Sequence, residues 1–483
     1  MPETLRSLWP DFGEASILAT LYSLAGFGLA VLLIGRLMRE KRAPANTFAW
    51  VLVIVLLPWL GVPLYLLIGS RKLERIARRK SRLYPALPPA ARAPAGAHPS
   101  PTAHAITAAG APPPVAGNSV QLLATGEDAY AVLEQHIRQA RTHIHITTFI
   151  LGRDDTGRRL IRLLTERARA GVKVRLLLDC VGSFLSRGSF VEPLRAAGGE
   201  VATFMPVIPF SSRGSANLRS HRKIAVFDHA TAIVGGHNLA REYLGPTHQA
   251  RRFRDVGAVV NGPAAAMLNE VFIADWCFAT RQTPEELHGE IPLRELNFSR
   301  GTAECQIVAS GPDVPGDPLY EGMVSMIQEA EESIWIVTPY FIPDEVLLRS
   351  LIVKARAGKE VVLITPRRSD HLVADLARGH YLRELCRAGG QVRFWAPGML
   401  HAKALIVDQR HALLGSANFD FRSLFVNFEI GVFIHTVPEV ARIRSWAAEL
   451  AARCHAYKPR QRKRRLPLEG VLEDLSRLLA PLL

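Results

Sequence analysis

The chain has 483 residues, of which 48% are hydrophobic, and its 59 Lys and Arg against 44 Asp and Glu give a formal net charge of +15. This length allows two sizeable domains, and the positive charge favours a polyanionic partner, either an anionic membrane or nucleic acid. The five cysteines are odd in number and form no C-x-x-C pair, which argues against a disulfide framework or a zinc site and indicates a reducing compartment.

Two apolar stretches open the chain, at residues 15–35 and 43–70, and neither contains Asp, Glu, Lys or Arg. Each is long enough to cross a bilayer as a helix. The first lacks a basic leading region and a small-residue cleavage site, which favours an uncleaved membrane helix over a signal peptide. We therefore predict an α-helical membrane anchor over residues 1–70, with apolar segments at 15–35 and 47–69.

Basic residues follow both apolar stretches, and they bear on the orientation of the anchor. A smaller cluster lies at residues 36–42 and a larger one at residues 71–80. If both stretches span the membrane, the positive-inside rule favours the larger cluster in the cytoplasm. Alternatively, Pro58, Gly61 and Pro63 break the second stretch into a re-entrant hairpin, which leaves both clusters on one side. Either alternative predicts that the rest of the chain is cytoplasmic.

A linker is predicted over residues 71–118, first basic and then rich in proline and alanine. A segment of this composition is not expected to bury a core, so residues 83–118 are predicted to form an extended tether.

Two similar halves follow, at residues 119–297 and 298–457. Short apolar runs typical of strands alternate in each half with amphipathic helical patterns. The strands are predicted at residues 120–123, 144–150, 172–178, 306–309, 334–338 and 360–365, and the helices at 130–139, 158–169, 319–329 and 346–355. This alternation predicts an α/β fold with two domains and largely parallel sheets.

The last segment, residues 458–483, combines a basic run with seven apolar residues at helical spacing. The basic run could bind anionic headgroups, or it could be a solvated linker or a nucleic-acid patch. Acidic side chains on the polar face disfavour an anionic bilayer, so this helix is predicted to dock on the protein.

One motif, H-x-K-x4-D, occurs twice, from His221 to Asp228 and from His401 to Asp408. Each copy is followed by an asparagine seventeen residues after its histidine, Asn238 in the first and Asn418 in the second. Two copies with the same downstream spacing indicate a duplicated site.

The residue types suit phosphoryl chemistry. One imidazole can attack phosphorus while a second protonates the departing oxygen. Lysine and asparagine can hold the phosphoryl oxygens without a metal or other cofactor. The candidate catalytic residues are those of the two motifs, namely His221, Lys223, Asp228, His401, Lys403 and Asp408. The candidate substrate-binding residues are Asn238, Asn418 and Ser416.

The aspartates differ from the other motif residues because side chains alternate along a strand. Asp228 and Asp408 fall on the face opposite the histidines, which favours a structural role even though they belong to the motif. Further along, Asp255 and Glu429 are predicted to orient the imidazoles through one ring nitrogen, the alternative being that they are solvated surface acids.

The paired motif resembles that of the phospholipase D superfamily. Gly235-Gly236-His237-Asn238 and Asp275-Trp276 resemble the first half of bacterial cardiolipin synthases, and Asn427-Phe428-Glu429 resembles the second half. Pro58-Trp59-Leu60-Gly61 resembles their membrane segment. The resemblance implies two tandem phospholipase D-like domains around one shared active site, in a multi-pass protein of the bacterial inner membrane.

The resemblance also implies a reaction. Phosphatidyl transfer from one phosphatidylglycerol to another would give cardiolipin and glycerol. His221 would carry the phosphatidyl group and His401 would act as acid and then base, although the residues alone are nearly symmetric between the two histidines. The implied partners are phosphatidylglycerol and an anionic membrane, with no nucleic acid.

Other functions stay open at this stage. A hydrolase, or a transferase with a different alcohol acceptor, would use the same motifs. A nuclease of the superfamily would explain the motifs and the charge but not the apolar stretches. A non-catalytic scaffold would require decayed motifs, and both motifs are intact.

Overall fold

The computed structural model describes residues 26–35, 51–59, 61–62, 80, 83, 100–206, 218–289 and 301–459. The chain divides into two units, residues 1–75 and residues 76–483, here called the anchor unit and the main unit. Residues 460–483, which hold most of the predicted basic run and the C-terminal helix, lie outside the described residues.

In the anchor unit, residues 26–35 and 51–56 are helical. A small core forms from Ala30, Leu33, Ile54 and Val62, while larger apolar side chains such as Phe27, Leu32, Leu56 and Trp59 are exposed. Within the described ranges, no helix combines the length and the apolar character that a membrane crossing requires. Much of the two predicted apolar segments lies outside those ranges.

The main unit contains a sheet that, in the described residues, has 15 strands and runs through both halves. The strands of the first half are β1 (Val115–Leu123), β2 (His143–Thr148), β3 (Lys173–Asp179), β4 (Glu200–Phe204), β5 (Ile224–Phe227), β6 (Thr231–Gly235) and β7 (Gly257–Asn261). The corresponding strands of the second half are β8 (Ala303–Ser310), β9 (Ser333–Val337), β11 (Glu360–Pro366), β12 (Gln391–Trp395), β13 (Ala404–Val407), β14 (His411–Gly415) and β16 (Glu429–Ile434).

The two halves have the same strand order. It is β1-β7-β6-β5-β2-β3-β4 in the first half and β8-β16-β14-β13-β9-β11-β12 in the second. The halves are joined where β1 pairs with β8 through an antiparallel, bulged register. A short strand, β17 (His455–Ala456), extends one edge, and β10 (Phe341–Ile342) pairs separately with β15 (Phe419–Asp420).

The prediction of largely parallel sheets was wrong. Within the 15-stranded sheet, parallel pairing is found in β2-β3-β4 and β9-β11-β12, and the other pairs of described strands are antiparallel. Helical crossovers explain the parallel part. The antiparallel part begins with hairpins whose turns place Asp228, His229, Asp408 and Gln409 at positive φ, a conformation that sequence alternation does not reveal.

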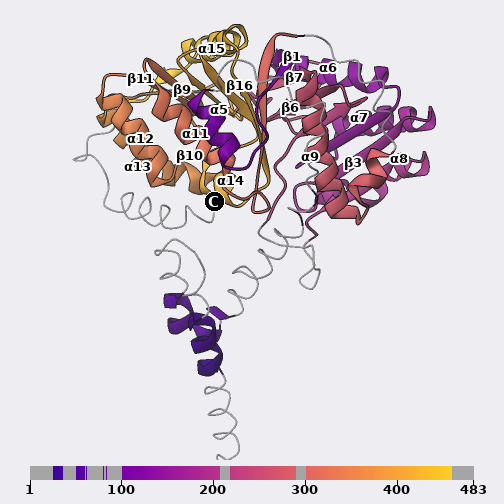
Figure 1. The fold of residues 1–483 in the computed structure, drawn as a ribbon, viewed down its shortest axis with the longest axis horizontal. Coiled ribbons are helices and arrows are strands. Elements are labelled where there is room, and N and C mark those ends of the chain that lie inside the picture. Colours follow the sequence, from indigo (N-terminus) through magenta and orange to yellow (C-terminus); the bar gives the residue numbers. More distant parts are fainter. Residues whose placement is uncertain are drawn as a thin grey trace, which may run out of the picture. The chain divides into compact units, whose positions relative to one another are not determined.

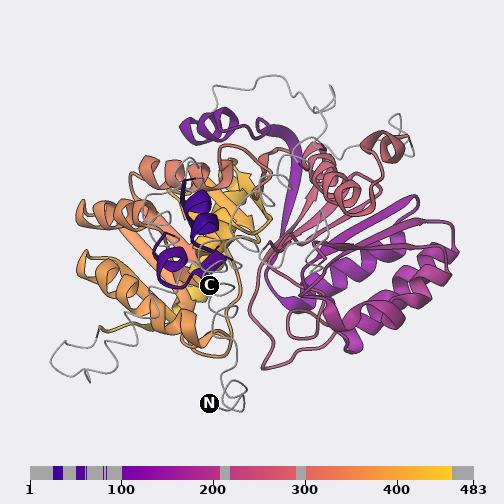
Figure 2. The same ribbon diagram turned by 90° about the horizontal axis from the view of Figure 1, so that it is seen from below.

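Helices cover both faces of the sheet (Figures 1 and 2). On one face lie α6 (Gly126–Gln139), α7 (Asp155–Arg169), α8 (Glu192–Ala196), α11 (Pro318–Glu329), α12 (Glu345–Arg356), α13 (Leu372–Arg387) and α14 (Phe421–Phe425). On the other face, α9 (Pro263–Thr280) and α15 (Val437–Ala452) share one core that spans both halves. Strand alternation divides the faces: in β5, Ile224 and Val226 point to the shared core and Ala225 and Phe227 to the opposite one.

The four predicted helices are all present, with ends that local chemistry accounts for. Thr125 and Asp154 cap the N-termini of α6 and α7 by accepting hydrogen bonds from Asp128 N and Gly157 N. Gly171 and Gly358 follow the C-terminal caps of α7 and α12 at positive φ, where glycine carries no steric penalty. A short helix, α10 (Pro284–His288), and two 3-10 turns, η3 (Phe184–Ser186) and η4 (Gly188–Phe190), complete the described elements.

The predicted tether differs from the structure over residues 100–118. Helix α5 (Pro101–Ala108) packs on α11, in the second half, although it precedes the first half in sequence (Figure 1). Ser100 caps it, and Ile106 is fully buried in the second-half core. An alanine-rich helix presents so little side-chain volume that it can pack closely, which proline and alanine content alone did not indicate.

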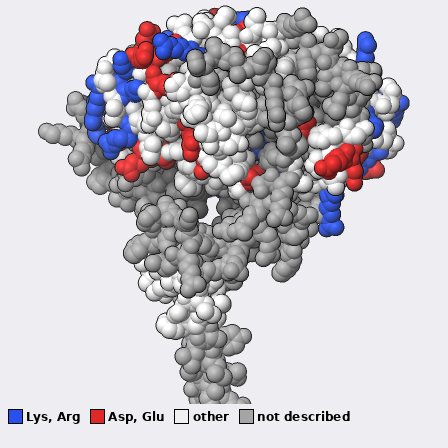
Figure 3. All heavy atoms as spheres, in the orientation of Figure 1, with Lys and Arg blue, Asp and Glu red and all other residues white. Residues whose placement is uncertain are grey.

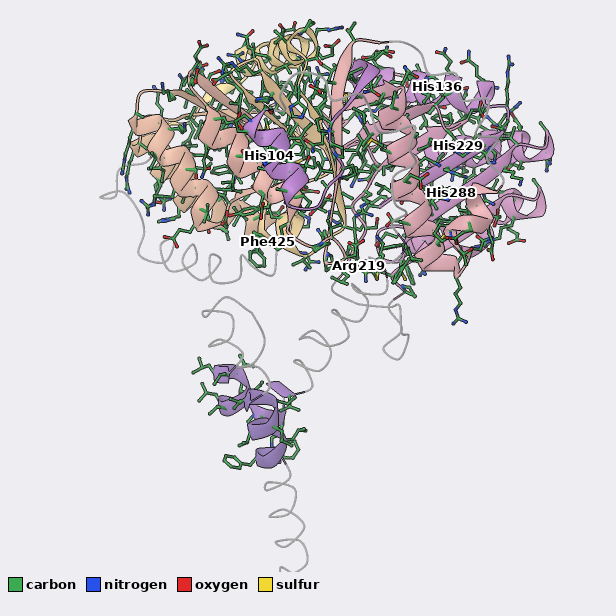
Figure 4. All side chains as sticks on the ribbon, in the orientation of Figure 1. His104, His136, Arg219, His229, His288 and Phe425 are labelled. Atoms are coloured by element: carbon green, nitrogen blue, oxygen red, sulfur yellow. The ribbon has the colours of Figure 1, made fainter. Side chains whose placement is uncertain are left out.

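Several histidines are buried in the neutral form. Burial, with His143 adding to the effect, lowers the pKa of His229 to about 4, and burial beside His411 lowers the pKa of His435 to about 3. The pKa of His145, which lies against Phe272, is also well below its usual value because of burial. His229 is labelled inside the first half in Figure 4.

These histidines predict acid sensitivity of the fold. In the unfolded chain their pKa is about 6.5, so the unfolded state binds protons first as the pH falls. The free energy of unfolding should therefore decrease between pH 6.5 and 4, by up to about 1.4 kcal/mol per pH unit for each histidine. Urea unfolding of the detergent-solubilised chain at pH 7.5 and 5.0, followed by tryptophan fluorescence, measures this slope. An unchanged slope in the double variant His229→Gln/His435→Gln would contradict the assignment.

Candidate active site

The sheet topology places both motifs at one edge of their sheets. Because β5 runs antiparallel to β2, the residues before β5 lie beside the carboxyl ends of β2 and β3. His221 and Lys223 immediately precede β5, and His401 and Lys403 precede β13 in the same way. Figure 4 labels Arg219, next to the first motif, and Phe425, seven residues after Asn418, along the lower edge of the main unit in that view.

Backbone pairing brings the two motifs to the boundary between the halves. Ser220 forms a bridge with Phe428, and Leu400 forms the equivalent bridge with Arg254. His221 N donates to Phe428 O at 2.9 Å, and His401 N donates to Arg254 O at 2.7 Å. Each histidine is therefore held by the backbone of the half to which it does not belong.

The predicted orienting acids contact the histidines across this boundary. Glu429 Oε1 lies 3.2 Å from His221 Nδ1, and Asp255 Oδ2 lies 2.6 Å from His401 Nδ1. Both acids are fully buried, and Asn427 Nδ2 is 3.3 Å from the same nitrogen of His221. The Nδ1 atoms face protein carboxylates, so Nε2 is the nitrogen of each ring that can meet a substrate.

Electrostatics couple the two motifs. Burial raises the pKa of Asp255, but His401, Lys403 and His237 outweigh it and hold that pKa well below the usual range. Burial and then Lys403 lower the pKa of His401 to about 4, with Lys223 of the first motif contributing. Asp255 is thus ionised and His401 neutral near pH 7, and Lys223 of the first motif lowers the pKa of the second motif's histidine.

The motif lysines are buried beside their own histidines. Lys223 Nζ donates to His221 O at 2.6 Å, and Lys403 Nζ lies 2.8 Å from His401 Nδ1. Burial lowers the pKa of Lys403 to about 7, and it lowers the pKa of Lys223 against the attraction of Glu429 and Asp255. A phosphate anion placed between these ammonium groups would favour their charged forms.

A cavity of about 230 Å³ opens beside His221. It is lined by Tyr340, Ile342, His371, Ala374, Asn418, Asp420, Arg422, Ser423 and Asn427. The Asn418 Oδ1 atom is buried there without a hydrogen-bond partner among the described residues, consistent with the predicted substrate contact. Asn238 is different, because its Oδ1 accepts a hydrogen bond from Ile150 N at 3.2 Å and is already occupied.

Asp228 and Asp408, which are among the catalytic candidates, bond to backbone amides away from the two histidines. Each lies at the far end of its strand from the histidine and caps a run of backbone amides. Asp228 accepts from the amides of Arg141, Thr142 and His143, and Asp408 accepts from those of Glu331, Glu332 and Ser333. The aspartates fix the turn that leads into β2 and β9.

Ser416 also has a place different from the predicted substrate contact. Its hydroxyl donates to Glu429 Oε2 and accepts from Ile430 N at 3.0 Å, and the residue is almost fully buried. Ser416 therefore holds the acid that faces His221.

Four buried charges behind the site were not predicted. Arg222 Nη1 lies 2.7 Å from Asp275 Oδ1, while Lys80 Nζ lies 2.6 Å from Asp275 Oδ1 and 2.5 Å from Asp313 Oδ2. All four side chains are at most 1% exposed. Arg222 also donates from Nε to Glu429 O at 3.0 Å. The cluster balances two cations against two anions and joins both halves directly behind Glu429.

Lys80, the last residue of the basic cluster at 71–80, is therefore buried in the main unit. Its ammonium also lies 4.8 Å from the centre of the Phe428 ring. Hydrophobic periodicity gave no signal for this position. The charged residue inside the first motif, Arg222, was the available hint that a buried counter-ion exists.

The charge balance predicts that Lys80→Met destabilises the main unit. Two buried aspartates would face one arginine, and breaking a buried ion pair from one side costs about 3–5 kcal/mol. Chemical unfolding of the full chain in detergent would measure this loss. As a control, Arg158→Met removes the partner of Asp155 in an exposed ion pair and should cost at most about 1 kcal/mol. Equal, small effects of both substitutions would contradict the buried cluster.

Comparison with known proteins agrees with this arrangement. Residues 133–276 and 323–451, one segment in each half, match the family described as cardiolipin synthase, PLD-like domain. Residues 28–70 match the phospholipase D–nuclease N-terminal family. The crystal structure of phosphatidylserine synthase from Haemophilus influenzae Rd KW20 has a similar fold, with a TM-score of 0.60 over 79% of this chain and 100% of that chain at 16% identity.

Curated relatives match over nearly the whole length. The cardiolipin synthase of Geobacillus thermodenitrificans (strain NG80-2) is 34% identical over 92% of this chain and 90% of its own. Cardiolipin synthase A of Pseudomonas fluorescens (strain SBW25) is 33% identical over 92% and 94%, and cardiolipin synthase 1 of Bacillus anthracis is 31% identical over 99% and 98%. With two intact motifs that meet at one boundary, the chain belongs to the cardiolipin synthase family of phospholipase D-like proteins.

Proposed function

We propose that this protein transfers a phosphatidyl group from one phosphatidylglycerol to a second, giving cardiolipin and glycerol. The observation that carries this proposal is the pair of imidazoles, each backed by a buried carboxylate from the opposite half. Two such imidazoles can serve as nucleophile and as acid–base in a two-step displacement. The relatives named cardiolipin synthase support this choice of substrate.

In the first step, Nε2 of His221 attacks the phosphorus of the donor lipid. A phosphorus–nitrogen bond forms as the bond from phosphorus to the glycerol headgroup oxygen breaks, and His401 gives that oxygen a proton. Glu429 faces the ring that becomes cationic and stabilises it. We assign His221 as the nucleophile because its side chain is 25% exposed and borders the cavity, whereas His401 is 11% exposed.

In the second step, a hydroxyl of another phosphatidylglycerol enters where glycerol left. His401 takes its proton, the oxygen attacks phosphorus, and the bond to His221 breaks. Lys223, Lys403 and Asn418 surround the phosphoryl oxygens during both steps. The negative phosphate should raise the pKa of His401 above about 4, so the protonation needed for the first step accompanies lipid binding.

The proposed substrate places the enzyme at a membrane. Residues 28–70 match the phospholipase D–nuclease N-terminal family, and the described part of the anchor unit exposes many large apolar side chains. We propose that residues 1–70 anchor the protein in the bacterial inner membrane with the main unit in the cytoplasm. In vesicles that contain both phosphatidylglycerol and phosphatidylethanolamine, a different product from the purified enzyme would reveal water, phosphatidylethanolamine or another supplied alcohol as acceptor.

Substitution of the two histidines should separate the two steps. With phosphatidylglycerol labelled in its phosphatidyl part, His221→Asn should give no covalent adduct after acid quenching. His401→Asn should still form an adduct but release it slowly, because the incoming hydroxyl lacks its base. Mass spectrometry of the labelled peptide identifies the modified residue, and label on His401 would exchange the two roles.

Pairing across the halves predicts an unusual pattern for the acids. Glu429→Gln should resemble His221→Asn by impairing adduct formation, and Asp255→Asn should resemble His401→Asn by impairing release, each by about 10²–10⁴-fold as for other acid–histidine pairs. Rapid-quench kinetics of the two steps distinguishes these effects. Ser416→Ala, which loosens Glu429, should impair the same step as Glu429→Gln but less. The opposite pattern would indicate pairing within each half.

A further inference from the structure

Two groups of apolar side chains are exposed on the main unit near the site. We call them the apolar rim, with Val181, Phe184 and Leu185 in the first half and Leu372, Val373 and Leu376 in the second. Their exposed fractions are 49%, 65% and 68% in the first group and 74%, 38% and 38% in the second. Isolated exposed apolar residues are normal on a protein surface, but clusters beside an active site call for a partner.

The equivalence of the halves places both groups at the edge that carries the motifs. The first group follows β3 and the second follows β11, which occupy the same position in the strand order. Each of these strands is parallel to the neighbour whose carboxyl end meets a motif histidine. The chain therefore leaves the sheet at the motif edge twice, once in each half, and both times it exposes apolar side chains.

Contacts tie the first group to the site. Ser183, between Val181 and Phe184, donates from its hydroxyl to Phe149 O at 2.8 Å. The Phe149 ring lies 4.4 Å from the His221 ring, centre to centre. The turn that carries the exposed side chains is thus bonded to Phe149, which lies directly beside the proposed nucleophile.

The second group borders the cavity itself. His371 and Ala374 line the cavity that also contains His221, and Leu372 and Val373 lie between them in sequence. Ala374 and Ala377 face inward against Ile342. Packing of that helical face leaves Leu372, Val373 and Leu376 directed outward at the first turns of α13.

Charge near the rim suits an anionic surface. Arg367 and Arg368, between β11 and α13, are both exposed. Figure 3 shows further Lys and Arg side chains gathered on the flank formed by α12 and α13. Apolar side chains with arginines beside them match the interface of a bilayer, where acyl chains lie just below anionic phosphates.

We propose that the apolar rim inserts into the bilayer that holds the lipid substrate and brings the cavity mouth to the level of the phosphates. This inference rests on the proposed function, because it names how a phospholipid reaches that site. The lipid phosphate could then approach His221 while its acyl chains stay in the membrane. Without the rim, each lipid would have to leave the bilayer completely, at a cost of about 0.8 kcal/mol for every CH₂ exposed to water.

The test uses the full chain in vesicles of phosphatidylglycerol and in solutions of a short-chain phosphatidylglycerol below its micelle concentration. The rim variants are Phe184→Ser/Leu185→Ser and Leu372→Ser/Val373→Ser. The matched control is Val353→Ser/Val437→Ser, which removes two valines that are 55% and 58% exposed, away from the motif edge. Each rim variant should lose at least tenfold of the turnover on vesicles and keep its turnover on the monomeric lipid, and the control should keep both.

A second measurement does not depend on activity. Phe184→Trp in vesicles with brominated acyl chains should show more quenched tryptophan fluorescence than the unsubstituted chain, and Val353→Trp should add only unquenched fluorescence. Equal loss of turnover on both substrates, no loss on vesicles, or no additional quenching would overturn the proposal. So would a rim variant that changes the oligomeric state in sedimentation, since the rim would then bind a second copy. Absence of cardiolipin from the unsubstituted enzyme on both substrates, with quenching intact, would instead reject the proposed function.

Discussion

The contacts that each motif histidine makes with the opposite half are the constraint on which the rest of the structure depends. Each histidine takes its backbone hydrogen bond and its carboxylate from the opposite half, Phe428 and Glu429 for His221 and Arg254 and Asp255 for His401. Among the described residues, the carboxylate beside each motif histidine comes from the other half. The pairing therefore requires a fixed relation between the halves, which the continuous sheet through β1 and β8 supplies.

Burial sets the properties of this boundary. Carboxylates withdrawn from water are tolerated where cations compensate them, and here the compensating groups are the motif residues themselves. Asp255 is ionised because His401 and Lys403 surround it, and its charge in turn raises the pKa of the imidazole and of the ammonium against the burial that lowers them. The groups proposed to bind the phosphate thus also hold the halves together.

Buried cations also compensate buried carboxylates away from the cavity, in the cluster of Lys80, Arg222, Asp275 and Asp313. This cluster links α9 of the first half to the segment after β8 of the second, and its Arg222 holds the backbone of Glu429. Lys80 belongs to the segment that precedes the sheet in sequence. Helix α5 also precedes the sheet in sequence, and it packs in the core of the second half. Lys80 and α5 therefore contribute to the stability of the main unit.

Much of this protein followed from its sequence because the responsible interactions are local. Hydrophobic alternation located strands and helices, since the period of a strand or helix is a property of neighbouring residues. The duplicated H-x-K-x4-D motif identified the histidines and lysines, and alternation indicated a structural place for Asp228 and Asp408. Asp255 and Glu429 were also expected to orient the histidines.

What the tertiary structure decided depends on contacts between residues far apart in the chain. Antiparallel pairing of β5, β6 and β7 rests on turn conformation and register, which periodicity does not encode. Long-range contacts also decide which acid meets which histidine. They place the Ser416 hydroxyl against Glu429, although the sequence predicted that it contacts the substrate. The burial of Lys80 and α5 had no sequence signal, because a lysine and an alanine-rich helix resemble solvent-exposed segments until their partners, Asp275, Asp313 and α11, are placed beside them. Local sequence patterns identify the strands, the helices and the chemical groups of the site, and only long-range packing decides which of these groups meet.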